Sequence, residues 1–166
     1  MQDAQPQLRQ IAGLIREETT LSLATTGEDG AAAVAPLFYL ADEELSLFWL
    51  SSSGSLHSRN LIIRPEVAVT IYRSVTGWRQ IRGVQMRGRA GAVGDSELRS
   101  GLLESYAERF RLGRIFRPLL GQSTLYGFRP EFIRFIDNTR RLGGGFELVR
   151  GPQGWSQTRA RRMNRS

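Results

Sequence analysis

The residues best suited to hold a phosphate group are gathered in one short part of the chain. Residues 51–55 are Ser-Ser-Ser-Gly-Ser, and His57, Ser58 and Arg59 follow. Hydroxyl groups and the open backbone around Gly54 can donate hydrogen bonds to a phosphate, and a helix that starts here adds its dipole. His57 and Arg59 can add positive charge. A phosphate site is one interpretation. The other is purely structural: the serines would form an ordinary helix cap, and His57 would occupy an exposed position of the helix.

Other protein-borne chemistry is scarce in this sequence. The chain has no cysteine and one histidine, His57. The composition excludes disulfides, thiolate nucleophiles and cysteine-ligated metal, and a histidine zinc site or a Ser-His-Asp triad would have to use His57. No catalytic residue is therefore assigned. If the protein is an enzyme, we expect a bound cofactor to carry the difficult chemistry.

The charge of the chain is concentrated near its end. The 166 residues carry a net charge of +7, and every basic residue is arginine. Residues 151–166 hold four arginines and no acid. We expect one domain over residues 1–150 and a solvated, disordered basic tail over residues 151–166. A nucleic-acid-binding module that uses this tail is an alternative, although the sequence has no helix-turn-helix or zinc pattern.

Hydrophobic periodicity predicts an alternation of helices and strands. Apolar residues at helical spacing predict helices over residues 7–18, 56–63 and 95–110, and a short helix within residues 111–122. Strands are predicted over residues 20–26, 31–40, 45–51, 66–72, 78–93 and 123–137. Three glycines make residues 142–146 a flexible turn. No apolar run is long enough for a transmembrane helix or a signal peptide, so we expect a cytoplasmic protein.

The order of these elements indicates an α+β fold. Strands that are joined by short polar turns pair antiparallel. Gly83, Gly88 and Gly91 interrupt the fifth predicted strand, and such glycines allow the bends that close a barrel. The sequence predicts an antiparallel split β-barrel with peripheral helices.

Three segments carry a resemblance to a known family. They are the serine-rich loop with its helix and Arg64-Pro65-Glu66-Val67-Ala68-Val69, then Arg82-Gly83-Val84-Gln85-Met86-Arg87-Gly88, and finally Phe135-Ile136-Asp137-Asn138-Thr139. In this order and spacing they resemble the pyridoxamine 5'-phosphate oxidase-like split β-barrels that bind flavin mononucleotide (FMN), and most closely an uncharacterised bacterial subgroup. The resemblance covers most of residues 11–148.

The resemblance implies a homodimer with a flavin at each of two symmetric interface sites. It also implies an FMN-dependent oxidoreductase. The residues expected to bind the cofactor come from four parts of the chain. They are Pro36, Leu37, Phe38, Tyr39, Leu50, Ser51, Ser52, Ser53, Ser55, His57, Ser58, Arg59, Arg82, Gln85, Asn138, Thr139 and Arg141.

Departures from the family pattern point to a different substrate. The family's phosphate-binding lysine is matched by His57, and the arginine before it by Leu56. The family's C-terminal Arg-Leu-His-Asp-Arg signature is matched by Arg141-Leu142-Gly143-Gly144-Gly145. We therefore expect that pyridoxamine phosphate is not the substrate. The sequence does not identify another one. Other relatives bind a deazaflavin or haem, and both cofactors stay as alternatives. Haem ligation would fall to His57 or to a less usual ligand, because there is no cysteine.

Overall fold

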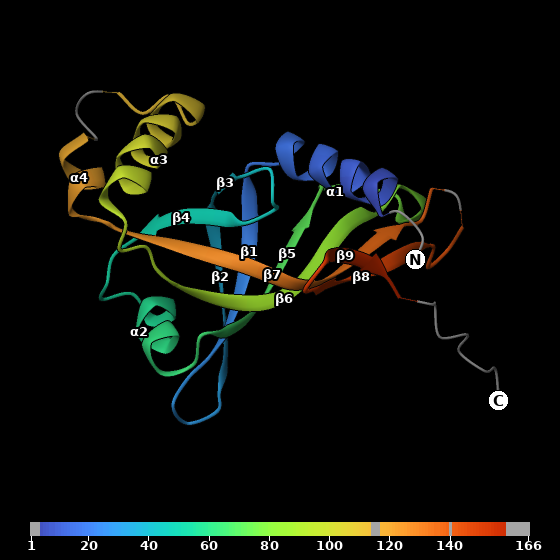
Figure 1. The fold of residues 1–166 in the computed structure, drawn as a ribbon, viewed down its shortest axis with the longest axis horizontal. Coiled ribbons are helices and arrows are strands. Elements are labelled where there is room, and N and C mark those ends of the chain that lie inside the picture. The colour runs from blue at the N-terminus through green and yellow to red at the C-terminus, as the bar shows by residue number, and fades with distance from the viewer. Residues whose placement is uncertain (1–3, 114–116, 140, 159–166) are drawn as a thin grey trace.

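The computed structural model describes residues 4–113, 117–139 and 141–158 (Figure 1). The helices are α1 (Gln5–Glu17), α2 (Leu56–Ile63), α3 (Ser96–Arg109) and α4 (Arg117–Gln122), with a 3₁₀ turn η1 at Trp78–Gln80. The strands are β1 (Thr20–Thr26), β2 (Ala32–Phe38), β3 (Leu40–Ala41), β4 (Leu47–Ser51), β5 (Glu66–Tyr72), β6 (Arg82–Ala92), β7 (Thr124–Asp137), β8 (Gly145–Gly151) and β9 (Gly154–Gln157).

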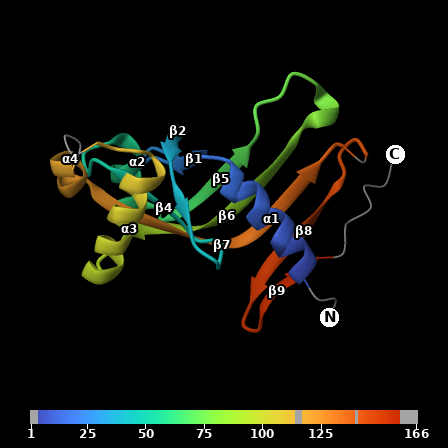
Figure 2. The same ribbon diagram turned by 90° about the horizontal axis from the view of Figure 1, so that it is seen from above.

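The described strands form one strongly curled antiparallel sheet. Its order is β2-β1-β5-β6-β7-β4-β3, and the β8–β9 hairpin branches from β7. All pairings are antiparallel. Helices lie at the ends and along one side of the sheet, with α2 and the β8–β9 hairpin at opposite ends (Figure 2). This arrangement confirms the predicted α+β split barrel.

Strand β7 runs through the whole sheet. It pairs with β4 at residues 124–128, with β8 at residues 132–136, and with β6 over most of its length. The thirteen steps between its fourteen residues, at roughly 3.3 Å each, span a little over 40 Å along the strand. The register with β6 shifts between Arg87 and Gly88, where a bulge bends the pair. A Cβ at Gly88 would overlap the carbonyl oxygen of Arg129, so only glycine lets the two strands meet here.

Alternating side chains fill the interior of the curled sheet. In β1 and β5 every second residue is buried, with Leu21, Leu23 and Val69 facing inward. Trp49 of β4 is fully buried among them. The apolar stripe of α1, which includes Ile11 and Ile15, covers this core. A smaller cluster of Leu40, Phe48, Tyr106 and Leu125 lies under α3.

Three predicted boundaries change for local reasons. Residues 78–80 form a 3₁₀ turn that leads into β6, and the predicted strand start at Trp78 is therefore wrong. The strand predicted from Leu45 starts at Leu47, because the Asp42 carboxylate accepts the backbone N–H groups of Glu44 and Ser46 and closes a turn. Helix α1 starts at Gln5, with a proline in its first turn, where its missing N–H costs nothing.

The C-terminal hairpin is the largest correction. Residues 142–144 lie in the predicted turn, but β8 already begins at Gly145, and residues beyond Gly151, expected to be disordered, form β9, which pairs with β8. Leu148 is fully buried and Trp155 packs against the core, so burial of these side chains stabilises the hairpin. The four arginines of the tail lie outside the described residues. Helix α4 agrees with the short helix predicted within residues 111–122.

Candidate functional site

The predicted phosphate-binding residues form one hydrogen-bonded cluster at the start of α2. Ser55 caps the helix, and its Oγ accepts the backbone N–H of Ser58 at 3.3 Å and donates to Ser58 Oγ at 2.8 Å. His57 Nε2 lies 2.8 Å from Ser51 Oγ and 3.1 Å from Ser55 Oγ. The structure thus joins the end of β4 to the first turn of α2 through side chains that sequence analysis had singled out.

The loop before α2 is shaped by two further contacts. Ser52 Oγ accepts the backbone N–H of Gly54 at 3.2 Å, and the guanidinium of Arg59 donates to the Gly54 carbonyl oxygen. Ser53 lies exposed in the same loop. The first backbone N–H groups of α2, at Leu56 and His57, have no partner among the described residues. Free N–H groups, hydroxyls and a nearby guanidinium fit the phosphate of a mononucleotide.

Burial sets the charge of His57. Desolvation lowers the pKa of this imidazole from its ordinary value of 6.5, because the charged form loses water. The side chain is therefore neutral at neutral pH. A bound phosphate would favour the charged form and raise that pKa again.

A buried hydrogen bond fixes α2 on the barrel. Asn60 Nδ2 donates to Thr25 Oγ1 of β1 at 3.0 Å, and both side chains are buried. Sequence analysis missed this pair. The available signal was a polar residue on the inner side of a short helix, opposite a threonine on a buried strand position. The bond holds the serine cluster in a set position relative to the sheet.

The predicted residues of β2, and Tyr39 directly after it, divide between two faces. Pro36 and Phe38 are exposed on the outer face, where Phe38 also contacts Phe110 with ring centres 4.8 Å apart. Leu37 packs against the core, and Tyr39 is fully buried with its hydroxyl donating to the Ile15 carbonyl oxygen at 2.6 Å. Burial raises the pKa of Tyr39 above its usual value. The side chains of Leu37 and Tyr39 thus lie in the interior.

The outer face of the sheet is hollowed beside β2. The hollow has a volume of about 570 Å³ and combines small side chains of β1 and β5 with polar side chains of β6, β7 and β8. Gln85 lines it, across from Thr70 in the strand register. Leu50, by contrast, packs half-buried against the cluster under α3. The hollow presents Gln85 on a surface that could receive a flat ring or a second protein chain.

The remaining predicted residues lie at the other end of β7. Arg82 Nε is 3.5 Å from Asp137 Oδ2, and Asp137 Oδ1 accepts the N–H and hydroxyl of Thr139 at 2.9 and 2.5 Å. Asn138 holds the turn by accepting the N–H of Gly143 at 3.0 Å, and Arg141 is exposed. The serine cluster flanks the first residue of β7, so about 40 Å of strand separates the two groups. One protomer does not bring them together.

The curled sheet, with short helices at its ends, defines the class of split β-barrel proteins. A family model described as pyridoxamine 5'-phosphate oxidase matches residues 8–137. The chain therefore belongs to the pyridoxamine 5'-phosphate oxidase family. No curated protein sequence matches it. Among the described residues, no helix has the length and apolar character needed to cross a membrane.

Solved structures show the same fold. A conserved hypothetical protein of Mycobacterium tuberculosis is 21% identical with a TM-score of 0.69, and covers 78% of this chain and 84% of its own. The haem storage protein HutZ of Vibrio cholerae is 26% identical with a TM-score of 0.63, over 74% and 89% of the two chains. A haem-binding protein of Mycobacterium smegmatis is 17% identical with a TM-score of 0.64, over 90% and 59%.

Proposed function

We propose that the protein binds FMN, with its phosphate at the start of α2, and that it acts as a flavin-dependent oxidoreductase. The observation that carries this proposal is the cluster of Ser51, Ser55, His57 and Ser58 beside two free backbone N–H groups. A flavin at this place would supply the exchange of electrons with a substrate. Family membership supports the same cofactor class.

Each part of the cluster has a separate task in this proposal. The N–H groups of Leu56 and His57 donate to phosphate oxygens at the positive end of the helix dipole. Ser51 Oγ and Ser55 Oγ lie 3.2 Å apart and contact each other in the free protein. When FMN binds, both hydroxyls rotate toward its phosphate. Arg59 neutralises charge from the rim of the loop. Asn60 keeps these groups in register with β1 through its bond to Thr25.

The length of β7 bears on how the site is completed. Asn138, Thr139 and Arg141 are too far from the serine cluster of the same chain to touch one mononucleotide, since β7 spans about 40 Å. In a two-fold dimer, these residues of a second copy can approach the flavin instead. The hollow around Gln85 is the face that such a dimer would cover. The dimer is thus part of the proposal.

Haem is the second candidate ligand. Two of the similar structures are a haem storage protein and a haem-binding protein. Among the described residues, the accessible side chains that could ligate iron are His57 and Tyr72, because Tyr39, Tyr106 and Tyr126 are buried. A His57 that already contacts Ser51 and Ser55 would have to turn away from them to reach iron.

The absorption spectrum of the purified protein tests both candidates. FMN gives a two-band flavin spectrum, whereas haem gives an intense Soret band, and mass spectrometry identifies the released ligand. Titration of apoprotein with FMN then tests the site. We expect His57→Ala and Arg59→Ala each to weaken binding about tenfold to a hundredfold, the effect of one charge-assisted hydrogen bond.

Arg64→Ala is the matched control for Arg59→Ala. Arg64 is exposed and follows the last residue of α2, at the end away from the serine cluster. Its removal should leave FMN affinity unchanged. Equal FMN affinity in all variants would place the phosphate elsewhere. A Soret band that is lost in His57→Ala would favour haem.

A further inference from the structure

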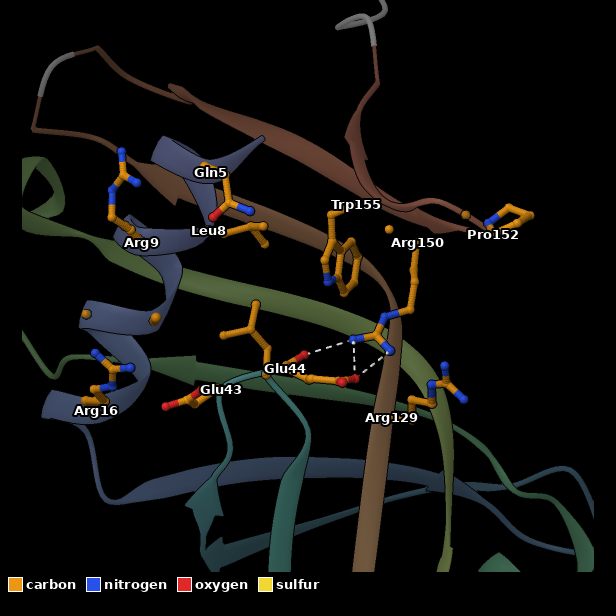
Figure 3. A pocket seen from close by; sticks show the side chains of 15 residues that line it. Gln5, Leu8, Arg9, Arg16, Glu43, Glu44, Arg129, Arg150, Pro152 and Trp155 are labelled. Carbon is orange, nitrogen blue, oxygen red and sulfur yellow. Dashed lines mark hydrogen bonds and ion pairs between the residues drawn. The ribbon is translucent and has the colours of Figure 1, made fainter. Parts of the chain in front are cut away.

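A second cavity lies at the end of the molecule away from α2. It is lined by α1, the turn between β3 and β4, Arg129 of β7 and the β8–β9 hairpin, is partly open to solvent, and has a volume of about 760 Å³ (Figure 3). This volume is within the range of small-molecule sites. None of the residues proposed to hold FMN lines it.

The cavity has an excess of positive charge. Four arginines and two glutamates line it. Arg150 is committed to Glu44, because its Nη2 donates to the Glu44 carbonyl oxygen at 3.0 Å and its Nη1 lies 3.3 Å from the carboxylate. Within the described part of the chain, the guanidinium groups of Arg9, Arg16 and Arg129 have no hydrogen-bond or ion-pair partner. These groups are free to meet an anion.

A flat aromatic wall faces this charge. Trp155 of β9 is half-buried, and the guanidinium carbon of Arg150 lies 5.2 Å from the centre of its ring. Figure 3 shows the indole pointing into the cavity, with Leu8 of α1 on the other side. The Nε of Arg150 is buried without a hydrogen-bond partner. Indole and guanidinium planes are the surfaces on which planar rings stack.

The walls are held in place by unusual local structure. Leu45, which lines the cavity, is buried with a φ of +67°, a conformation that costs energy for a residue with a branched side chain. Asp42 holds this turn with bonds to the N–H groups of Glu44 and Ser46 at 2.9 and 2.8 Å. Gln7 donates to Gln157 at 3.1 Å and joins α1 to β9. The cavity is therefore built from braced elements.

We propose that this cavity binds a small planar aromatic anion. The ring lies against Trp155 and Leu8, and the anionic group is bound by the guanidinium group of Arg9 or of Arg16, which lie about two helical turns apart on α1. Glu43, exposed in the turn between β3 and β4, can accept hydrogen bonds from hydroxyl or amino groups of the ligand. A nucleoside monophosphate and an aromatic carboxylate share this chemistry.

Isothermal calorimetry on the full-length protein tests the proposal with three probes: adenosine 5'-monophosphate, 2-naphthoate and inorganic phosphate. We expect saturable binding of at least one aromatic probe, and binding of inorganic phosphate that is weaker by about tenfold or more, since phosphate lacks the ring. The aromatic probe that binds identifies the kind of anion. Absence of binding by both aromatic probes, or equal binding of inorganic phosphate, would overturn the proposal.

Variants then place the ligand. The double variant Arg9→Gln/Arg16→Gln changes exposed side chains and should keep the fold while it weakens binding about tenfold or more. Arg64→Gln, which is remote from the cavity, is the control. Trp155→Phe should abolish the quenching of tryptophan fluorescence by the probe, whereas Trp78→Phe should retain it. Unchanged affinity in the double arginine variant would contradict the assignment.

FMN is itself a planar anion, so competition separates this cavity from the flavin site. The same titrations are repeated with saturating FMN. We expect the aromatic probe to bind with unchanged affinity and Trp155→Phe to retain FMN affinity. Displacement of FMN by the probe would mean that one site takes both ligands, and the second site would be refuted while FMN binding stands.

Discussion

His57 Nε2 lies 2.8 Å from Ser51 Oγ, so the chain's single histidine is joined to the last residue of β4. Ser55 Oγ also lies 3.1 Å from the same nitrogen. The imidazole therefore has a set orientation in the free protein. The same contacts keep it partly away from water, and this burial lowers its pKa.

The first prediction concerns the pH dependence of stability. The folded-state pKa of His57 lies below the 6.5 of the unfolded chain, so the unfolded state takes up the proton first. This contribution to the free energy of unfolding is complete above about pH 6.5 and is lost as the pH falls through the lower folded-state pKa. Urea denaturation at about pH 7 and about pH 5 should show a larger loss in the wild type than in His57→Asn. Parallel losses in both proteins would refute the assignment.

The second prediction concerns two glycines of β6. Gly88→Ala should lower the free energy of unfolding by about 1–3 kcal/mol or more, since its Cβ would overlap the backbone of Arg129. Gly91→Ala is the matched control, because a Cβ there meets nothing within 4 Å. Its effect should stay within about 0.5 kcal/mol. Equal effects in chemical denaturation would show that the two strands can separate at Gly88 without cost.

The third prediction concerns assembly. We expect light scattering to report a homodimer at micromolar concentration. Ala68→Arg places a long cation in the hollow of the outer face, opposite Arg87 in the register, and should yield monomers that bind FMN weakly. Ala41→Arg, at an exposed position of β3, should remain dimeric. A monomeric wild type would contradict both the dimer and a site shared between protomers.

The fourth prediction concerns the family's parent reaction. By resemblance, Gly143 and Gly145 match positions where the oxidases carry substrate-binding side chains, and both have positive φ, at +67° and +149°. A Cβ at Gly145 would also overlap the Phe135 carbonyl oxygen, so a side chain is excluded there, whereas at Gly143 only the backbone conformation opposes one. Protein saturated with FMN should form no pyridoxal phosphate from pyridoxamine 5'-phosphate in air. Turnover of about one per second or faster would contradict this prediction and show that the protein has the oxidase activity of the family.

Sequence periodicity predicted the barrel and its order of helices because alternation is strong where one face is buried. The serine cluster was also predictable, since its members are close in sequence and a helix cap brings them together. Asn60 and Thr25 were missed because their contact joins residues that are far apart in the chain. The β8–β9 hairpin was missed because glycines dominate its start, and its burial depends on isolated residues, Leu148 and Trp155. Distances along β7 required the three-dimensional structure.

The position of β7 also sets which parts of the molecule can open separately. Because β6 runs along most of this strand while β4 and β8 each cover one part of its other edge, opening the β8–β9 hairpin breaks only one ladder of hydrogen bonds and leaves the barrel paired. Local unfolding should therefore start at the hairpin, whose amide protons would exchange with solvent sooner than those of β6 and the centre of β7. We therefore expect the split barrel to combine a slowly exchanging centre with an outer hairpin, carrying Trp155, that exchanges sooner despite its contacts with α1 and Glu44.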